Sequence, residues 1–197
     1  MTAKAELRQK MRGILEGIPA QEARRQAEQA AERLGEWPLY RGAINVLLYA
    51  ALPGELDSGP MLRRVLADGK GLLLPRCEAG ESMQAVRVED LHMLVPGRFG
   101  IREPSRLLPA ADPQVVDLVL APGLAFDTAG ARLGRGKGIF DRFLPRIRGA
   151  VAGVAYLEQI LPSLPAGARD VRMDFLVTAQ GVLPARSVYK GEGSGIG

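Results

Sequence analysis

The chain has 197 residues, of which 47% are hydrophobic and 24% charged, a composition typical of a globular protein with one substantial core. Its single cysteine, Cys77, excludes an internal disulfide framework and a multi-cysteine zinc site, and its single histidine, His92, lacks any metal-ligand spacing. The net charge of +4 is spread along the chain, so it suits polyanionic small molecules at least as well as a nucleic acid.

Three further classes of protein are excluded by what the sequence lacks. No apolar run approaches the roughly 20 residues that a helix needs to span a bilayer. Charged residues alternate near the N-terminus with no apolar signal-peptide core behind them, so we expect a cytoplasmic protein without a membrane partner. No G-x-S-x-G element supports a serine hydrolase. Any catalysis must therefore use carboxylates, cations, backbone N–H groups and a bound metal.

The N-terminal part of the chain is predicted to hold three helices and one strand. Thr2 can cap the first helix, and Ser58 and Pro60 open the third, which Gly69 ends. The strand is an apolar run closed by turn residues. We predict the helices over residues 2–15, 19–37 and 58–69 and the strand over residues 44–50.

The rest of the chain is predicted to hold short strands and one more helix. The apolar runs that predict strands cover residues 71–75, 85–88, 115–121, 151–155 and 175–178. Residues 89–114 carry four prolines and are predicted to be mostly loop. A helix is expected over residues 139–148, ended by Gly149, and the glycine-rich tail 190–197 is expected to be disordered.

This alternation of strands and helices predicts an α/β layered fold with a mainly parallel sheet flanked by helices. The sequence contains no internal repeat and no linker long enough to mark a domain boundary. We therefore expect a single domain over residues 1–189.

Three alternating glycines, Gly134, Gly136 and Gly138, stand directly ahead of the last predicted helix. Alternating glycines let backbone N–H groups converge on a phosphate, and Arg135 and Lys137 between them supply positive charge. A nucleoside triphosphate is the natural ligand. The spacing matches neither the P-loop nor the dinucleotide-binding fingerprint, and from spacing alone a plain surface turn stays an open alternative.

The residues around this loop resemble a known signature. The run P-G-L-A-F-D at 122–127, followed by G-A-R-L-G-R-G-K-G at 130–138 and by Asp141, closely resembles the nucleotide-binding signature of the 5-formyltetrahydrofolate cyclo-ligase family. Four shorter elements occur in the family's order, at residues 4–8, 54–58, 75–76 and 99–104. The resemblance extends over most of the chain.

The resemblance implies a Rossmann-like fold of the sugar-phosphate isomerase and CoA-transferase kind. It also implies an enzyme that uses ATP as co-substrate, with Mg²⁺, to close 5-formyltetrahydrofolate into 5,10-methenyltetrahydrofolate. The formyl oxygen attacks the γ-phosphoryl group, and N10 then attacks the activated carbon as phosphate departs. Such a reaction needs alignment of two substrates and neutralisation of phosphate charge.

The resemblance also assigns residues to roles. Leu52, Glu55, Asp57 and Phe99 would bind the folate, and Asp141 and Asp170 would hold the magnesium. Arg8, Arg135 and Lys137 would act in catalysis. The residues expected to bind ATP lie in the first helix and the glycine loop: Lys4, Ala5, Glu6, Leu7, Arg8, Arg132, Leu133, Gly134, Arg135, Gly136, Lys137, Gly138, Ile139 and Phe140.

Apart from the resemblance, plainer interpretations of these residues stay open. Lys4 and Arg8 could be solvated helix charges, and Asp141 a carboxylate that stabilises a helix N-terminus. Glu55 and Asp57 could belong to a turn, with Asp57 or Ser58 capping the next helix.

One departure from the family pattern concerns Ile139 and Phe140, where the family usually has two tyrosines. Loss of a hydroxyl bonded to a phosphate would cost about 1.5–3 kcal/mol. The alternatives are therefore a weakened or non-catalytic relative that binds nucleotide or folate, and, from another class, an RNA-binding module. The second lacks clustered aromatic residues for base stacking. We expect a monomer whose partners are small molecules and not nucleic acid.

Overall fold

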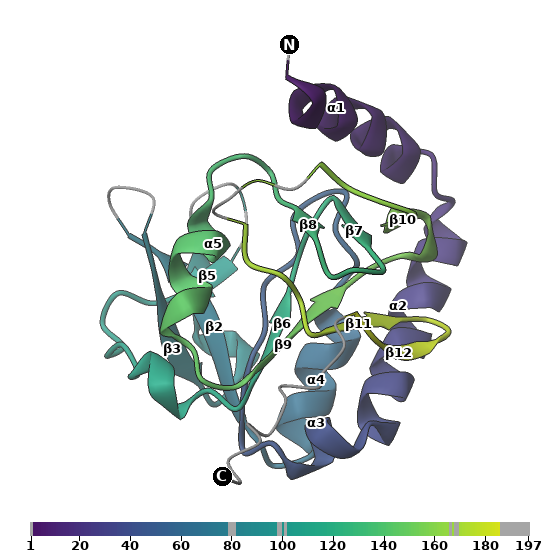
Figure 1. Cartoon of the computed structure of the whole chain (residues 1–197). Coiled ribbons are helices and arrows are strands. Elements are labelled where there is room, and N and C mark those ends of the chain that lie inside the picture. The colour runs from purple at the N-terminus through teal and green to yellow at the C-terminus, as the bar shows by residue number, and fades with distance from the viewer. Residues whose placement is uncertain are drawn as a thin grey trace, which may run out of the picture.

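A seven-stranded sheet forms the centre of the molecule (Figure 1). The structure is a computed structural model, and it describes residues 2–78, 82–97, 100, 102–165, 167 and 170–185. Its strand order is β12-β11-β9-β6-β1-β2-β3. The strands are β1 (Asn45–Leu47), β2 (Gly71–Cys77), β3 (Met83–Val88), β6 (Leu118–Ala121), β9 (Ala150–Val154), β11 (Phe175–Thr178) and β12 (Gly181–Pro184).

The inner strands of this sheet all run parallel, and only the edge strands β3 and β12 run antiparallel to their neighbours. From β1 the chain continues to β2 on one side, whereas β6, on the other side of β1, leads on to β9 and β11. The order of the strands therefore reverses between β1 and β6. In open parallel sheets, ligands bind beyond the carboxyl ends of the strands at such a point.

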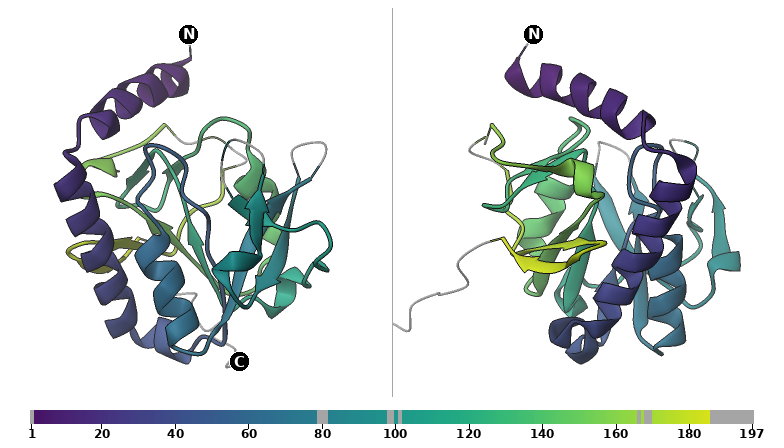
Figure 2. Two further views of the ribbon diagram at one scale, coloured as in Figure 1. Left: turned by 180° about the vertical axis from the view of Figure 1, so that it is seen from behind. Right: turned by 90° about the vertical axis from the view of Figure 1, so that its right-hand side faces the viewer.

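Consecutive residues of the strands face opposite sides of the sheet and build two hydrophobic clusters. Val46 belongs to one cluster and Leu47 to the other, as the two-residue period of a strand requires. Helices α2 (Ala20–Glu36) and α4 (Gly59–Ala67) cover one face, and the short helix α5 (Ile139–Phe143) covers the other (Figure 2). The layered α/β fold predicted from the sequence is confirmed.

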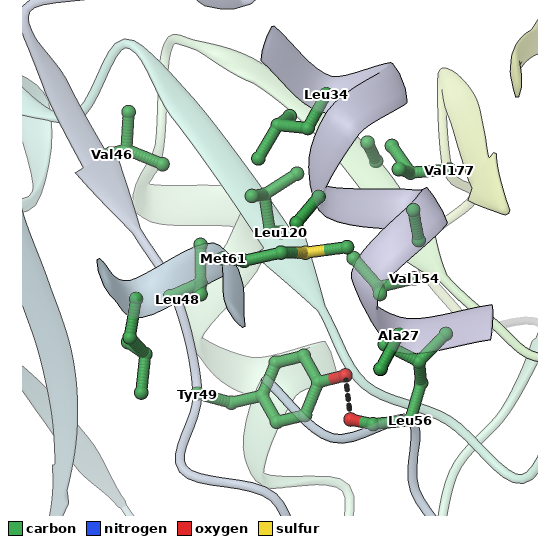
Figure 3. Packing of buried hydrophobic residues seen from close by; sticks show 14 of the residues in the cluster. Ala27, Leu34, Val46, Leu48, Tyr49, Leu56, Met61, Leu120, Val154 and Val177 are labelled. Atoms are coloured by element: carbon green, nitrogen blue, oxygen red, sulfur yellow. Dashed lines mark hydrogen bonds between the residues drawn. The ribbon is translucent and has the colours of Figure 1, made fainter. Parts of the chain in front are cut away.

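Side chains from the helices fill the space above the inner strands (Figure 3). Met61 of α4 and Leu34 of α2 lie among strand residues such as Leu120, and all three are fully buried. Tyr49, just after β1, is also buried, and its hydroxyl donates to the Leu56 carbonyl at 2.8 Å. This bond closes the loop that follows β1 at the carboxyl edge of the parallel strands.

Helix α1 (Ala3–Glu16) stands apart from these layers, across the loops at the carboxyl ends of the parallel strands (Figure 1). Only Met11 and Leu15 are buried in it. Two further views show that it meets α2 at an angle and reaches over the edge of the sheet (Figure 2). The α1 helix therefore forms one wall of whatever lies beyond the strand ends.

The predicted elements hold with three differences. The apolar run 44–50 pairs only over Asn45–Leu47, since the chain leaves the sheet to form the loop that Tyr49 closes. The run 115–121 forms a strand only from Leu118, after a 3-10 turn, η4 (Pro113–Val115). The helix predicted over 139–148 is wrong beyond Phe143. Pro145 has no N–H to continue it, and a 3-10 turn, η5 (Leu144–Arg146), follows instead.

Several short elements were not predicted. A small sheet beside the main one has the order β10-β7-β8, and two short strands lie within the predicted loop 89–114. Their two- or three-residue length is too short for a period to show in the sequence. The elements are α3 (Pro38–Gly42), η2 (Leu91–Met93), β4 (Leu94–Pro96), β5 (Arg102–Pro104), β7 (Ala125–Asp127), β8 (Arg132–Leu133), η6 (Leu157–Gln159) and β10 (Ile160–Leu161).

The tail 190–197 lies outside the described residues. Within the described part of the chain, no helix has both the length and the apolar character needed to cross a membrane.

The packing of the inner strands predicts a large effect of truncation at Leu120, which is fully buried. Leu120→Ala should lower the free energy of unfolding by about 2–5 kcal/mol, because it leaves a cavity in the core. Leu107→Ala is the matched control, since that side chain is 94% exposed, and it should change the free energy by no more than about 0.5 kcal/mol. Urea unfolding followed by circular dichroism measures both. Equal effects would contradict this assignment of the core.

Candidate active site

A cleft of about 600 Å³ opens beyond the carboxyl ends of the parallel strands. This volume lies within the range of about 300–1,000 Å³ that is usual for small-molecule sites. The loop after β1, the ends of β2 and β6, the glycine loop and helix α1 all contribute to its walls. The cleft therefore occupies the position that the reversal of strand order predicts.

Most of the residues predicted to form the site line this cleft. They are Lys4, Arg8, Leu52, Glu55, Arg132, Leu133, Gly134, Arg135, Gly136, Lys137, Gly138, Ile139, Phe140, Asp141 and Asp170. They come from segments far apart in the sequence. The tertiary structure therefore brings together, in one cleft, residues that the resemblance assigned to folate, ATP and magnesium binding.

Four predicted residues, Ala5, Glu6, Leu7 and Asp57, are not part of the cleft lining. Ala5, Glu6 and Leu7 lie on α1 outside it, and Leu7 packs against the core instead. Asp57 is exposed, and its carboxylate accepts a hydrogen bond from the Gly59 N–H at the start of α4. Asp57 therefore does not line the cleft, and its side chain bonds the backbone at the start of a helix instead. Phe99 lies outside the described residues.

The aspartate of the P-G-L-A-F-D run is a structural residue. Asp127 is buried, and its Oδ1 accepts from the N–H groups of Ala129 and Ala131 at 3.0 and 2.8 Å. Its Oδ2 accepts from the Leu164 N–H at 2.9 Å. These bonds shape the turn between β7 and β8 and so set the point from which the glycine loop leaves the small sheet.

The glycine loop, residues 134–138, connects β8 to α5. Gly136 and Gly138 have φ values of 109° and 62°, a region that residues with a side chain rarely adopt. Within the described part of the chain, the N–H groups of these two glycines donate no hydrogen bond. Arg8 Nε donates to the Gly134 carbonyl at 2.9 Å, which ties α1 to the loop. The loop can therefore present backbone donors to an anion beneath α1.

Helix α5 adds little to this anion site. A helix of the ten residues predicted here would have a dipole that favours a phosphate at its start, but the α-helix has five residues. Because partial charge at a helix end comes from aligned peptide dipoles, so short a helix contributes weakly. The loop N–H groups and the cations around them must supply most of the attraction.

A first ion pair joins α1 to the far side of the cleft. Lys4 Nζ lies 2.5 Å from Asp170 Oδ2, and the same oxygen accepts from the Gly167 N–H at 2.6 Å. Burial alone would raise the pKa of Asp170, but the hydrogen bonds from Lys4 and Gly167 outweigh it and hold that pKa below its usual value. Asp170 is therefore ionised at neutral pH, as a metal ligand or a partner for Lys4 must be.

A second ion pair lies under the glycine loop. Arg132 is 7% exposed, and its Nη2 donates to Asp141 Oδ1 at 2.8 Å while Nη1 donates to the Pro122 carbonyl at 3.1 Å. Its guanidinium stands 5.6 Å from the centre of the Phe140 ring. These contacts make Arg132 an anchor for the Asp141 carboxylate as well as a positive charge at the floor of the cleft.

The third ion pair connects the loop after β1 with the glycine loop. Arg135 Nε donates to Glu55 Oε1 at 2.9 Å, and the Leu52 N–H donates to Glu55 Oε2 at 2.9 Å. Arg135 also donates to the Pro53 carbonyl. Burial raises the pKa of Glu55, and the bonds from Leu52 and Arg135 act against that rise. The buried carboxylate depends on these two donors.

Asp141 and Asp170 fit a magnesium ion that shares its ligands with phosphates. In the described part of the chain no three His, Cys, Asp or Glu residues gather as a metal cage. Mg²⁺ does not require one, because it commonly takes one or two carboxylates and completes its shell with waters and phosphate oxygens. Each aspartate has one oxygen in its ion pair and a second that accepts no hydrogen bond from the described residues.

Eight other residues that line the cleft were not predicted as site residues. They are Tyr49, Ala50, Pro53, Pro75, Cys77, Met83, Pro122 and Gly123. Most follow or end a parallel strand, so strand order would have identified them, had it been known. Gly123 is also needed for packing, because a side chain there would lie 2.7 Å from the Phe126 ring.

Comparison with known proteins shows the family of the chain. A model of the 5-formyltetrahydrofolate cyclo-ligase family matches residues 1–179. A probable 5-formyltetrahydrofolate cyclo-ligase of Caenorhabditis elegans is 31% identical over 88% of this chain and 91% of its own. The mouse cyclo-ligase is 26% identical over 88% and 92%.

Two solved structures share the fold. The solution structure of Aquifex aeolicus 5,10-methenyltetrahydrofolate synthetase is 36% identical, covers 98% of both chains and superimposes with a TM-score of 0.87. A 5,10-methenyltetrahydrofolate synthetase from Mycoplasma pneumoniae is 18% identical, covers 90% of this chain and 99% of its own and gives a TM-score of 0.73, a likeness of fold alone.

The Lys4–Asp170 pair predicts that α1 depends on Asp170 for part of its docking. Both side chains are about a quarter exposed, so the pair should contribute up to about 1 kcal/mol. Asp170→Asn should therefore speed hydrogen exchange of the α1 amides up to about fivefold. Glu36→Gln, which removes an exposed ion pair within α2, is the control and should leave α1 unchanged. Unaltered α1 exchange in Asp170→Asn would show that other contacts hold the helix.

Proposed function

The chain belongs to the 5-formyltetrahydrofolate cyclo-ligase family, and we propose that its cleft performs the ATP-dependent cyclisation of 5-formyltetrahydrofolate to 5,10-methenyltetrahydrofolate, with release of ADP and phosphate. One observation carries the proposal. A single cleft holds a cation-bearing glycine loop on one side and, on the other, a buried carboxylate beside apolar walls. A reaction between a triphosphate and a pterin-bearing substrate needs these two surfaces side by side.

The glycine loop would bind the triphosphate. Gly136 and Gly138 offer backbone N–H groups, and Arg8, Arg135 and Lys137 bring positive charge to the same wall. Charge-assisted hydrogen bonds to phosphate are about twice as strong as neutral ones. Lys4, which reaches the cleft from α1, would add a further cation once Asp170 releases it.

The loop after β1 would bind the pterin. The ring N–H and amino groups of a pterin are donors, and Glu55 offers them a carboxylate in a buried setting. Tyr49, Leu52 and Pro53 line the neighbouring wall and can cover the flat ring. Asp57 has no place in this arrangement.

The two surfaces would align the formyl oxygen with the γ-phosphorus. That oxygen attacks, ADP leaves, and the resulting phosphorylated intermediate loses phosphate when N10 attacks the formyl carbon. Arg8, Arg135 and Lys137 would offset the charge that builds up on the transferred group and on ADP. Asp141 and Asp170 would hold Mg²⁺, which when bound neutralises phosphate charge. The chain's main contribution is therefore alignment in a partly desolvated cleft.

The weakened relative stays the second candidate because of Ile139 and Phe140. Both line the cleft without a hydroxyl. Phe140 nevertheless keeps an aromatic ring beside Arg132, and the ion pairs and glycine loop are all in place. We therefore favour the active enzyme, acting as a monomer in the cytoplasm on small-molecule substrates alone.

Activity is the first test of this proposal. Purified protein with ATP, Mg²⁺ and 5-formyltetrahydrofolate should form methenyltetrahydrofolate, followed by its absorbance, and should release one phosphate per product. Omission of ATP or chelation of Mg²⁺ should abolish the signal. A protein that binds both substrates and forms no product would instead be the non-catalytic relative.

Lys137 provides a test of the phosphate side. Lys137→Ala should weaken ATP binding by about tenfold to a hundredfold, since a charge-assisted hydrogen bond contributes about 1.5–3 kcal/mol. Folate binding should change little. Lys10→Ala removes an exposed charge of α1 outside the cleft and should leave both affinities unaltered. Titration calorimetry measures all four values, and normal ATP affinity in a folded Lys137→Ala protein would remove the loop from the nucleotide site.

A further inference from the structure

The Glu55–Arg135 ion pair joins the two halves of the cleft. Glu55 lies in the loop after β1 and Arg135 in the glycine loop, 80 residues later, and the Arg135 Nε lies 2.9 Å from the Glu55 Oε1. Under the proposed function, on which this inference rests, Glu55 faces the pterin and Arg135 faces the phosphates. Each side chain is thus committed to the other in the protein without ligands.

The two partners differ in how much they need the pair. The Glu55 side chain is 5% exposed, whereas that of Arg135 is 31% exposed. Without Arg135, the Glu55 carboxylate would keep only the Leu52 N–H as a donor in the described part of the chain. A buried charge that loses its partner is strongly unfavourable, but a part-exposed guanidinium stays solvated. The ion pair therefore stabilises mainly the buried Glu55 carboxylate, and in doing so it restrains Arg135.

We propose that this ion pair couples the binding of the two substrates, so that each binds more tightly when the other is present. When the folate is absent, a triphosphate that binds Arg135 removes a hydrogen-bond donor from the buried Glu55 carboxylate. The loss of that donor is a free-energy cost that weakens triphosphate binding. When the pterin is bound, its N–H groups replace Arg135 at Glu55, and the arginine moves to the phosphates without that cost. The coupling would keep Arg135 from the phosphates until the formyl group is there to attack them.

Thermodynamic linkage makes the effect symmetric and measurable. If folate tightens nucleotide binding by some factor, nucleotide must tighten folate binding by the same factor. Couplings between sites are commonly about 5- to 150-fold. We expect a factor in this range.

The experiment is a set of calorimetric titrations on the full chain. A non-hydrolysable ATP analogue with Mg²⁺ is titrated without folate and with saturating 5-formyltetrahydrofolate, and the folate is titrated with and without the analogue. In the wild type, both affinities should rise by the same factor.

Two variants separate coupling from simple contact. Glu55→Gln keeps the shape of the side chain but needs no cation, so Arg135 is free. This variant should bind the analogue alone more tightly than the wild type does, and added folate should tighten it no further. In Arg135→Gln, the Glu55 carboxylate has lost the guanidinium that the pterin N–H groups would otherwise have to replace. Folate alone should therefore bind more tightly than in the wild type, and the coupling should again vanish. Asp68→Asn, which alters an arginine–carboxylate pair outside the cleft, is the control and should keep the wild-type coupling.

Independent affinities in a wild type that turns over substrate would overturn the coupling and leave the proposed function standing. The titration of the ATP analogue alone tests the restraint on Arg135 without folate and without turnover. If Glu55→Gln binds the analogue no more tightly than the wild type, the ion pair does not restrain Arg135. If Glu55→Gln fails to fold, the folate titration of Arg135→Gln decides in the same way.

Discussion

The reversal of strand order between β1 and β6 is the constraint on which the site depends. These neighbouring parallel strands send the chain in opposite directions, so the loops after their carboxyl ends diverge and leave space between them. The loop from β1 brings Glu55 to one side of that space. The turn after β6, with Pro122 and Gly123, forms the floor and leads into the small sheet that carries the glycine loop. Helix α1 then covers an opening that the sheet has already made.

Charge balance inside the cleft follows from its burial. Three cations that suit a triphosphate, Lys4, Arg132 and Arg135, each pair with a carboxylate in the protein without ligands. An isolated charge would be costly at the buried members, Arg132 and Glu55, and the pairs avoid that cost while keeping both signs available. Substrate and metal binding then becomes an exchange of partners. Phosphates would replace the carboxylates as partners of the cations, and a metal ion or the pterin would replace the cations as partners of the carboxylates. Binding by exchange links the ligands to one another, which is the basis of the coupling through Glu55.

Hydrogen bonds that shape the backbone around the cleft decide whether these pairs can form. Tyr49 closes the loop after β1 through its bond to the Leu56 carbonyl, and Asp127 shapes the β7–β8 turn through three backbone N–H groups. Gln159, fully buried, donates to the Gly123 carbonyl at 2.7 Å and holds the floor of the cleft. A sequence motif such as P-G-L-A-F-D thus mixes residues that shape the backbone with residues that line the site.

The sequence by itself determined what depends on near neighbours: the helices over most of their length, the buried strands, the α/β class, the glycine loop and the charges beside it. Most of the residues that the resemblance selected line the cleft, whereas Asp57 and the α1 residues Ala5, Glu6 and Leu7 do not. Only the tertiary structure decided that Lys4 meets Asp170, 166 positions away, and that Arg135 meets Glu55, because these pairings follow from the order of strands in the sheet. The early end of α5 at Phe143 was within reach of sequence reasoning, since Pro145 forbids its continuation, but the small sheet was not. Its strands are too short for a period to show, and β10 pairs with β7 in the register Ile160↔Phe126, a non-local contact that no local pattern encodes.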